Sequence, residues 1–216
     1  MKTQNIILLH GIACTPFVMA LLEIHFKYKG YNVLNIDYPS RKLCLEKCAD
    51  HVHNKISAFL KKHPHPTSFV THSMGGLVLR AYTKKYPTDF IHRAVMIAPP
   101  NKGSHVADNL RNIKLFQKIF GPAGQQLITN QFGLQDVLVS KLPFETAVIT
   151  GNFSINPLAY LFMFNKAHDG KVPVECTYID GMKEHLIVFA SHLALLIHPT
   201  VINQSYNFIK NGQFEK

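Results

Sequence analysis

One serine lies where a predicted strand passes into a predicted helix. Ser73 stands in the run Thr71-His72-Ser73-Met74-Gly75-Gly76, after the stretch 68–70 and before the helix-forming stretch 76–82. A strand, a tight turn holding one serine, and a helix are the layout of a nucleophile elbow, which presents the serine oxygen at the tip of a sheet. Gly75 supplies the small residue needed where such a helix passes close to the strand. Thr71 departs from the usual G-x-S-x-G pattern, so the motif alone leaves an ordinary βα turn open.

A serine becomes a nucleophile only beside a base, and the base needs an acid to orient it. Behind an elbow of this kind the chain order is serine, then acid, then histidine. Three histidines surround the last predicted strand, 186–190: His185, His192 and His198. His185 precedes that strand, whereas His192 follows its carboxyl end by two residues. We therefore expect His192 to be the base, and His185 and His198 suit capping or surface roles better.

The acid is expected between the fifth and sixth predicted strands. Asp169 lies there in a polar Asp169-Gly170 turn. Asp180, Glu175 and Glu184 are rivals, and Asp-Gly is also simply a turn sequence. Spacing alone favours Asp169 only slightly.

An ester or amide carbonyl attacked by a serine also needs two N–H donors for its oxyanion. The backbone N–H of Met74 would be one donor, and that of Ile12, in the loop after the first strand, the other. Gly11 lets that backbone approach closely. The candidates for the substrate pocket are His10, Gly11 and His72 near the serine and Leu158, Leu161 and Phe162 from the apolar patch 158–164. Plain core packing is the alternative interpretation of that patch.

Strand-like and helix-like stretches alternate along the chain. Apolar runs predict strands at 6–9, 31–36, 68–70, 94–98, 146–150 and 186–190. Helical spacing predicts helices through Phe17, Leu21, Ile24 and Tyr28, over 44–60, after the serine, and from Pro199 to Gly212. This alternation predicts a doubly wound, mostly parallel α/β sheet of about six strands with helices on both faces. The first strand and the elbow strand would flank its switch point, beyond whose carboxyl ends ligands bind.

Composition indicates one globular domain, 1–216, with a cap or lid possible within 101–145. The formal charge is +10, but the 23 Lys and Arg are scattered, with no arginine-rich run or basic-aromatic interleaving. Nucleic-acid binding is therefore not expected, while weak association with an anionic membrane surface is compatible with the charge.

No cofactor or metal site is indicated, because the sequence has no H-E-x-x-H and no second cysteine pair. The four cysteines are expected to be free thiols. The apolar stretch before His10 is too short for a signal-peptide core, and no run reaches membrane-spanning length. A cytoplasmic location is the expectation.

Five motifs in order give the chain a likeness to a known family. The chain resembles small bacterial α/β-hydrolases of the lipase/esterase type over nearly its whole length. The matching stretches are Leu8-Leu9-His10-Gly11, Thr71-His72-Ser73-Met74-Gly75-Gly76, Ala98-Pro99-Pro100-Asn101-Lys102-Gly103-Ser104 with Asp108, Asp169-Gly170-Lys171-Val172, and Ser191-His192. The fourth resembles the family's acid loop and lifts Asp169 above its rivals. Thr71 in place of glycine and the lack of the family's usual leading hairpin are departures that touch no catalytic group.

The resemblance implies hydrolysis of a small or lipid-like acyl ester through an acyl-enzyme. Ser73 would attack, His192 would act as base and Asp169 would hold the imidazole. A thioesterase or acyltransferase would use the same residues. A non-catalytic binding protein would not need serine, acid and base in order. The sequence specifies neither the acyl group nor the oligomeric state.

Overall fold

Six parallel strands form one sheet in the order β2-β1-β3-β4-β5-β6. The computed structural model describes residues 4–103, 122, 138–155 and 166–215. The strands are β1 (Asn5–Leu9), β2 (Asn32–Ile36), β3 (Thr67–His72), β4 (Ile91–Ile97), β5 (Glu145–Gly151) and β6 (Glu184–Val188). The helices that cover them are α1 (Ala20–Tyr28), α2 (Leu45–Lys62), α3 (Met74–Lys85) and α8 (Pro199–Asn211), with short 3-10 helices η1 (Pro16–Met19), η2 (Val174–Cys176) and η3 (Ala194–Ile197).

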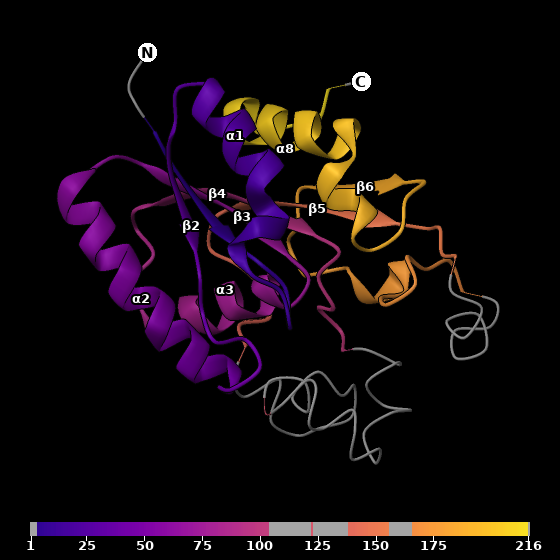
Figure 1. The fold of residues 1–216 in the computed structure, drawn as a ribbon, viewed down its shortest axis with the longest axis horizontal. Helices are drawn as coiled ribbons and strands as arrows, with labels where there is room; N and C mark the ends of the chain where they lie inside the picture. Colours follow the sequence, from indigo (N-terminus) through magenta and orange to yellow (C-terminus); the bar gives the residue numbers. More distant parts are fainter. Residues whose placement is uncertain (1–3, 104–121, 123–137, 156–165, 216) are drawn as a thin grey trace.

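The sheet winds in two directions from β1. β1 pairs with β2 on one side and with β3 on the other, and β4, β5 and β6 follow in sequence order (Figure 1). The predicted doubly wound fold is confirmed, and its switch point lies between β1 and β3. Ligands of such sheets bind beyond the carboxyl ends of the strands at this point.

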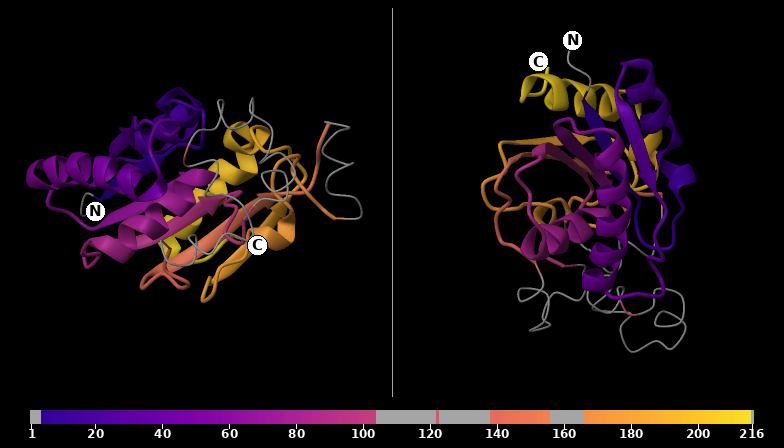
Figure 2. Two further views of the ribbon diagram at one scale, coloured as in Figure 1. Left: turned by 90° about the horizontal axis from the view of Figure 1, so that it is seen from below. Right: turned by 90° about the vertical axis from the view of Figure 1, so that its left-hand side faces the viewer.

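Helices cover both faces of the sheet, which explains the unbroken apolar runs. In β1, Ile6 and Leu8 point into the core beneath α1 and α8, and Ile7 and Leu9 point into the core beneath α2 and α3. The two helix layers lie on opposite sides of the sheet in Figures 1 and 2. A strand buried on both faces has no polar side, so alternation is absent from its sequence.

The last strand lies two residues earlier than the predicted 186–190. Among the described residues, β6 is an edge strand that pairs with β5 alone, and its pairing runs from Ala147↔Glu184 to Gly151↔Val188. The pairing with β5 therefore determines where β6 begins and ends. The apolar run does not, because it continues past the strand into exposed Phe189. His185 consequently lies inside the strand, near its amino end, and not before it.

The apolar residues whose spacing predicts a helix at α1 are exposed in the structure. We call Phe17, Leu21, Ile24 and Tyr28 the α1 stripe; Phe17 is 84% exposed and Tyr28 is 85% exposed. The side chains that pack on the sheet from this segment are instead Met19, Leu22 and Phe26. Apolar residues lie on both sides of η1 and α1, so spacing predicts the helix but not its orientation.

Parts of the predictions fall outside the described residues. These include Leu158, Leu161 and Phe162, Asp108, and most of the cap or lid expected within 101–145. In the ranges that are described, no helix is both long and apolar enough to cross a membrane.

Candidate active site

Ser73 occupies a strained turn between β3 and α3. Its backbone has φ 53° and ψ −125°, a conformation that a non-glycine residue adopts only when its surroundings enforce it. Two backbone hydrogen bonds supply this constraint: Ser73 N donates to Ile97 O at 2.8 Å, and Gly76 N donates to Ser73 O at 3.0 Å. The side chain is thereby set at the carboxyl edge of the central strands.

Gly75 and Gly76 each avoid a different steric conflict. A Cβ on Gly75 would lie 2.4 Å from the carbonyl oxygen of Leu9, so only glycine lets α3 pack this closely on the end of β1. A Cβ on Gly76 would lie 3.1 Å from Pro99 Cβ, so glycine lets α3 pack closely on the segment after β4, whereas its distance of 3.4 Å from Thr71 Oγ1 would be an ordinary contact.

Asp169 and His192 form a buried hydrogen-bonded pair. His192 Nδ1 lies 2.7 Å from Asp169 Oδ2. The other carboxylate oxygen, Oδ1, accepts from the backbone N–H groups of Lys171 and Val172 at 2.9 and 2.8 Å. The backbone N–H of His192 also donates to the Asp169 carbonyl at 2.9 Å. The carboxylate is thus fixed in direction and leaves Nε2 of His192 available to exchange a proton.

His72 links this pair to the serine. It directly precedes Ser73, its Nε2 lies 3.1 Å from the His192 carbonyl oxygen, and the two imidazole rings are 4.7 Å apart. Burial lowers the pKa of His72 well below its ordinary value, and the neighbouring His192 lowers it further. The structure therefore brings Ser73, His192 and Asp169 to one end of the sheet, where a neutral His72 directly precedes the serine and contacts His192.

The loop after β1 passes directly over the serine. A Cβ on Gly11 would lie 3.1 Å from Ser73 Cβ and 3.0 Å from His72 Nδ1, so a larger side chain would push this loop away. The loop carries Ile12, whose N–H is a candidate oxyanion donor. The other candidate, Met74, opens α3, where the first N–H groups of a helix have no partner within the helix.

Residues after β2, which no sequence motif indicated, support this loop. Tyr38 donates its hydroxyl hydrogen to the His10 carbonyl and stacks on the His10 ring at 4.3 Å. Ala13 has φ 56°, and its N–H donates to Ser40 Oγ at 3.2 Å. His10 is fully buried in this stack, so its ring supports the loop. The detectable signal is that β2 ends beside β1, which places residues 37–40 at the same edge.

Arg80, which no sequence motif indicated either, fixes the far side of the elbow helix. Its guanidinium donates from Nε to Val139 O at 2.9 Å and from Nη1 to Asn101 O at 2.9 Å. Burial lowers the pKa of Arg80 to about 10, which leaves it charged at neutral pH. One side chain thereby ties α3 to the segments after β4 and before β5.

The two rejected histidines have local structural roles. His198 is the N-cap of α8, and its Nδ1 accepts from Thr200 N at 3.2 Å. His185 Nε2 lies 3.0 Å from Thr177 Oγ1, at the amino end of β6. Neither contacts Asp169.

The three rival acids lie elsewhere. Asp180 is exposed, Glu175 pairs with Lys166 at 2.5 Å, and Glu184 accepts from Phe214 N at 2.5 Å. Of the four candidate carboxylates, only Asp169 contacts His192.

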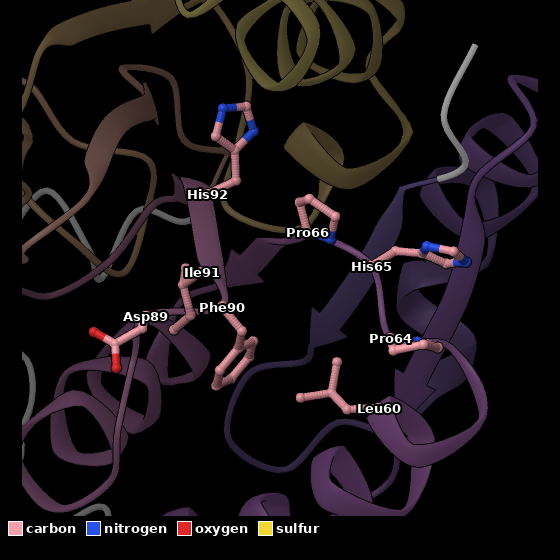
Figure 3. A pocket seen from close by; sticks show the side chains of 8 residues that line it. All are labelled: Leu60, Pro64, His65, Pro66, Asp89, Phe90, Ile91 and His92. Carbon is pink, nitrogen blue, oxygen red and sulfur yellow. The ribbon is translucent and has the colours of Figure 1, made fainter.

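A cavity of about 510 Å³ lies at the end of the strands opposite to Ser73. Its lining includes Phe90 and Leu60, with the polar groups of Asp89, His65 and His92 directed apart (Figure 3). It opens near the amino ends of β3 and β4 and contains none of the residues gathered around Ser73. Across the described ranges, no three His, Cys, Asp or Glu side chains are grouped so as to hold a metal ion.

Comparison with known proteins identifies relatives of the fold. The mature form of Bacillus licheniformis lipase BlEst2 has 16% identity and a TM-score of 0.78, covering 97% of this chain and 92% of that one. Phospholipase PlaB from Legionella pneumophila, in complex with thio-NAD, has 16% identity and a TM-score of 0.75, covering 93% of this chain and 57% of that one. The metagenomic carboxyl esterase MGS0156 has 18% identity and a TM-score of 0.72, covering 90% and 66%.

The chain thus spans little more than half of PlaB and about two thirds of MGS0156. No curated protein sequence matches it. Residues 6–195 match the model of the Alpha/beta hydrolase family. Since that match takes in every strand of the sheet together with Ser73, Asp169 and His192, the protein belongs to the alpha/beta hydrolase family.

Proposed function

We propose that the protein is a serine hydrolase that cleaves carboxylic esters through an acyl-enzyme on Ser73. The observation that carries the proposal is the buried 2.7 Å contact between Asp169 and His192 at the edge where the elbow presents Ser73. Such a pair holds the imidazole in one tautomer and stabilises the imidazolium that forms when it accepts a proton.

The reaction has two half-steps with the same groups. Ser73 Oγ attacks the ester carbonyl carbon while Nε2 of His192 takes the hydroxyl proton. The N–H groups of Ile12 and Met74 stabilise the oxyanion, and its collapse expels the alcohol, which receives the proton from His192. Water then attacks the acyl-enzyme while His192 takes its proton, and His192 passes that proton to Ser73 Oγ as the second tetrahedral intermediate collapses and releases the carboxylic acid.

The relatives support an acyl ester as the substrate class. A lipase, a phospholipase and a carboxyl esterase share this fold with the chain. Their low identity limits the support to the fold, so the substrate is proposed as a small or lipid-like acyl ester. A thioester would be cleaved by the same groups, and p-nitrophenyl esters and thioesters of increasing acyl length separate the two.

Fluorophosphonate labelling tests the nucleophile. The wild type should be labelled on Ser73 and should hydrolyse p-nitrophenyl esters. Ser73→Ala should lose labelling and at least about 10⁴-fold of kcat, because no other group replaces the attacking oxygen. Ser57→Ala, on α2, is the matched control and should behave as wild type. An unlabelled wild type, or labelling that survives in Ser73→Ala, would refute the proposal.

A further inference from the structure

His72 is buried beside the nucleophile with a defined hydrogen-bond direction. Its side chain is 1% exposed, and its Nε2 lies 3.1 Å from the backbone carbonyl oxygen of His192. A carbonyl oxygen only accepts hydrogen bonds, so Nε2 of His72 carries the hydrogen. His72 is therefore the donor in a bond to the main chain of His192.

The surroundings keep His72 in this form. Its other nitrogen, Nδ1, has no hydrogen-bond partner among the described residues, so nothing there favours a second proton. The titratable groups that face the ring are His192, Lys171 and His10, all of which are neutral or cationic. Burial is the largest cause that lowers the pKa of His72, and the neighbouring His192 lowers it further, so the ring is neutral and donates to the His192 carbonyl from Nε2–H.

The hydrogen bond from His72 connects His192 to a part of the fold that its bonds to Asp169 do not reach. His192 N and Nδ1 are both bound to Asp169, so they anchor the base to the acid loop. β6 ends at Val188, and residues 189–193 run beyond it as a loop. Within the described residues, the bond from His72 is the hydrogen bond that joins this loop to β3, the strand that carries Ser73.

We propose that His72 is a positioning residue that holds His192 in register with Ser73 by donating Nε2–H to the His192 carbonyl. The part concerning turnover rests on the proposed function; the part concerning the orientation of His192 does not. Since small misplacements of a reacting group can lower the rate by about 10²-fold, loss of this bond should act on kcat. Although His72 was a pocket candidate from its position, it is 1% exposed and its Nε2 is bound to the main chain, so it offers a substrate little surface and KM should change little.

Matched substitutions separate the hydrogen bond from packing. His72→Phe keeps a ring without a donor, while His72→Gln places an amide N–H near the position of Nε2. We expect His72→Phe to lower kcat on p-nitrophenyl esters by about 10- to 100-fold, with KM within about twofold. We expect His72→Gln to recover most of the loss. His72→Asn, whose amide is too short to reach the carbonyl, should resemble His72→Phe. His53→Phe, on α2, should match wild type.

Proton NMR supplies a readout that does not need turnover. The Nδ1–H of His192, hydrogen-bonded to Asp169, should give a downfield resonance in wild type and His72→Gln. It should broaden or shift in His72→Phe and His72→Asn. An inactive wild type with this NMR pattern would refute the proposed function and leave the positioning role intact. Equal losses in the Gln and Phe variants, or wild-type kcat and NMR in His72→Phe and His72→Asn, would overturn the positioning role.

Discussion

Two neighbouring imidazoles hold their hydrogens on opposite nitrogens. His192 directs Nδ1 to the Asp169 carboxylate at 2.7 Å, and His72 directs Nε2 to the His192 carbonyl at 3.1 Å. Each tautomer is set by an acceptor that cannot donate. Nε2 of His192 is consequently left with its lone pair, which is the form a general base for Ser73 requires.

Replacing the Asp169 carboxylate by an amide tests this arrangement of hydrogens. In Asp169→Asn an N–H₂ group can face Nδ1 of His192, which then accepts and moves its hydrogen to Nε2. The wrong tautomer cannot take the serine proton, so we expect kcat to fall about 10³- to 10⁴-fold with the fold retained. Asp180→Asn, at an exposed carboxylate, should leave kcat near wild type. Steady-state kinetics with circular dichroism measures both, and equal effects would contradict the assignment.

At the scale of the element, α3 is fixed at its start and again near its middle. Gly75 packs against the Leu9 carbonyl at its start, and Arg80 binds the carbonyls of Val139 and Asn101 further along. The strained backbone of Ser73 lies immediately before this helix. Because α3 is held rigidly by these contacts, it can keep the backbone of Ser73 in its strained conformation.

Removing the guanidinium should loosen that helix. Arg80→Met fills similar space but leaves the buried Asn101 carbonyl oxygen and the partly buried Val139 carbonyl oxygen without their charged donor. Such losses cost about 2–4 kcal/mol, so we expect the free energy of unfolding to fall by this amount. Urea denaturation measures it. Lys61→Met, on the exposed side of α2, should change stability by less than about 0.5 kcal/mol, and a similar loss in both variants would argue against the clamp.

The elements differ in how far their sequences predict them. β1 is buried on both faces, so its apolar run marks it directly. The ends of β6 depend on where β5 stops pairing, which no local pattern in 184–190 contains. The orientation of α1 depends on which apolar side meets the sheet, and both sides are apolar in its sequence.

At the scale of the molecule, the candidate site is assembled from residues far apart in the chain. The order β2-β1-β3 places the loops after these three strands at one end of the sheet. Strand ends and chain order suggested Ser73 and His192 as candidates, whereas Asp169 stood out from its rivals only through the resemblance of its loop to the family's acid loop. Contacts such as Tyr38 to His10 and His72 to the His192 carbonyl join segments 28 and 120 residues apart. They depend on side-chain packing in three dimensions, so spacing could not predict them.

The α1 stripe also bears on how copies of the protein interact in solution. The chain carries a formal charge of +10, which repels copies from one another at low ionic strength, while the stripe offers them an apolar contact. The screening length falls from about 10 Å at 0.1 M salt to about 3 Å at 1 M. We therefore expect the second virial coefficient, measured by static light scattering, to turn from positive to negative as salt rises.

Substitution within the stripe separates the two contributions. Leu21→Ser with Ile24→Ser removes apolar surface without altering the charge, so the repulsion should remain and the attraction should weaken. The virial coefficient of this variant should stay positive at salt concentrations where that of the wild type is negative. Identical salt curves would show that the stripe does not govern this attraction. If instead the variant behaves as expected, the outer side of α1 contributes to the colloidal stability of the protein while its inner side packs on the sheet.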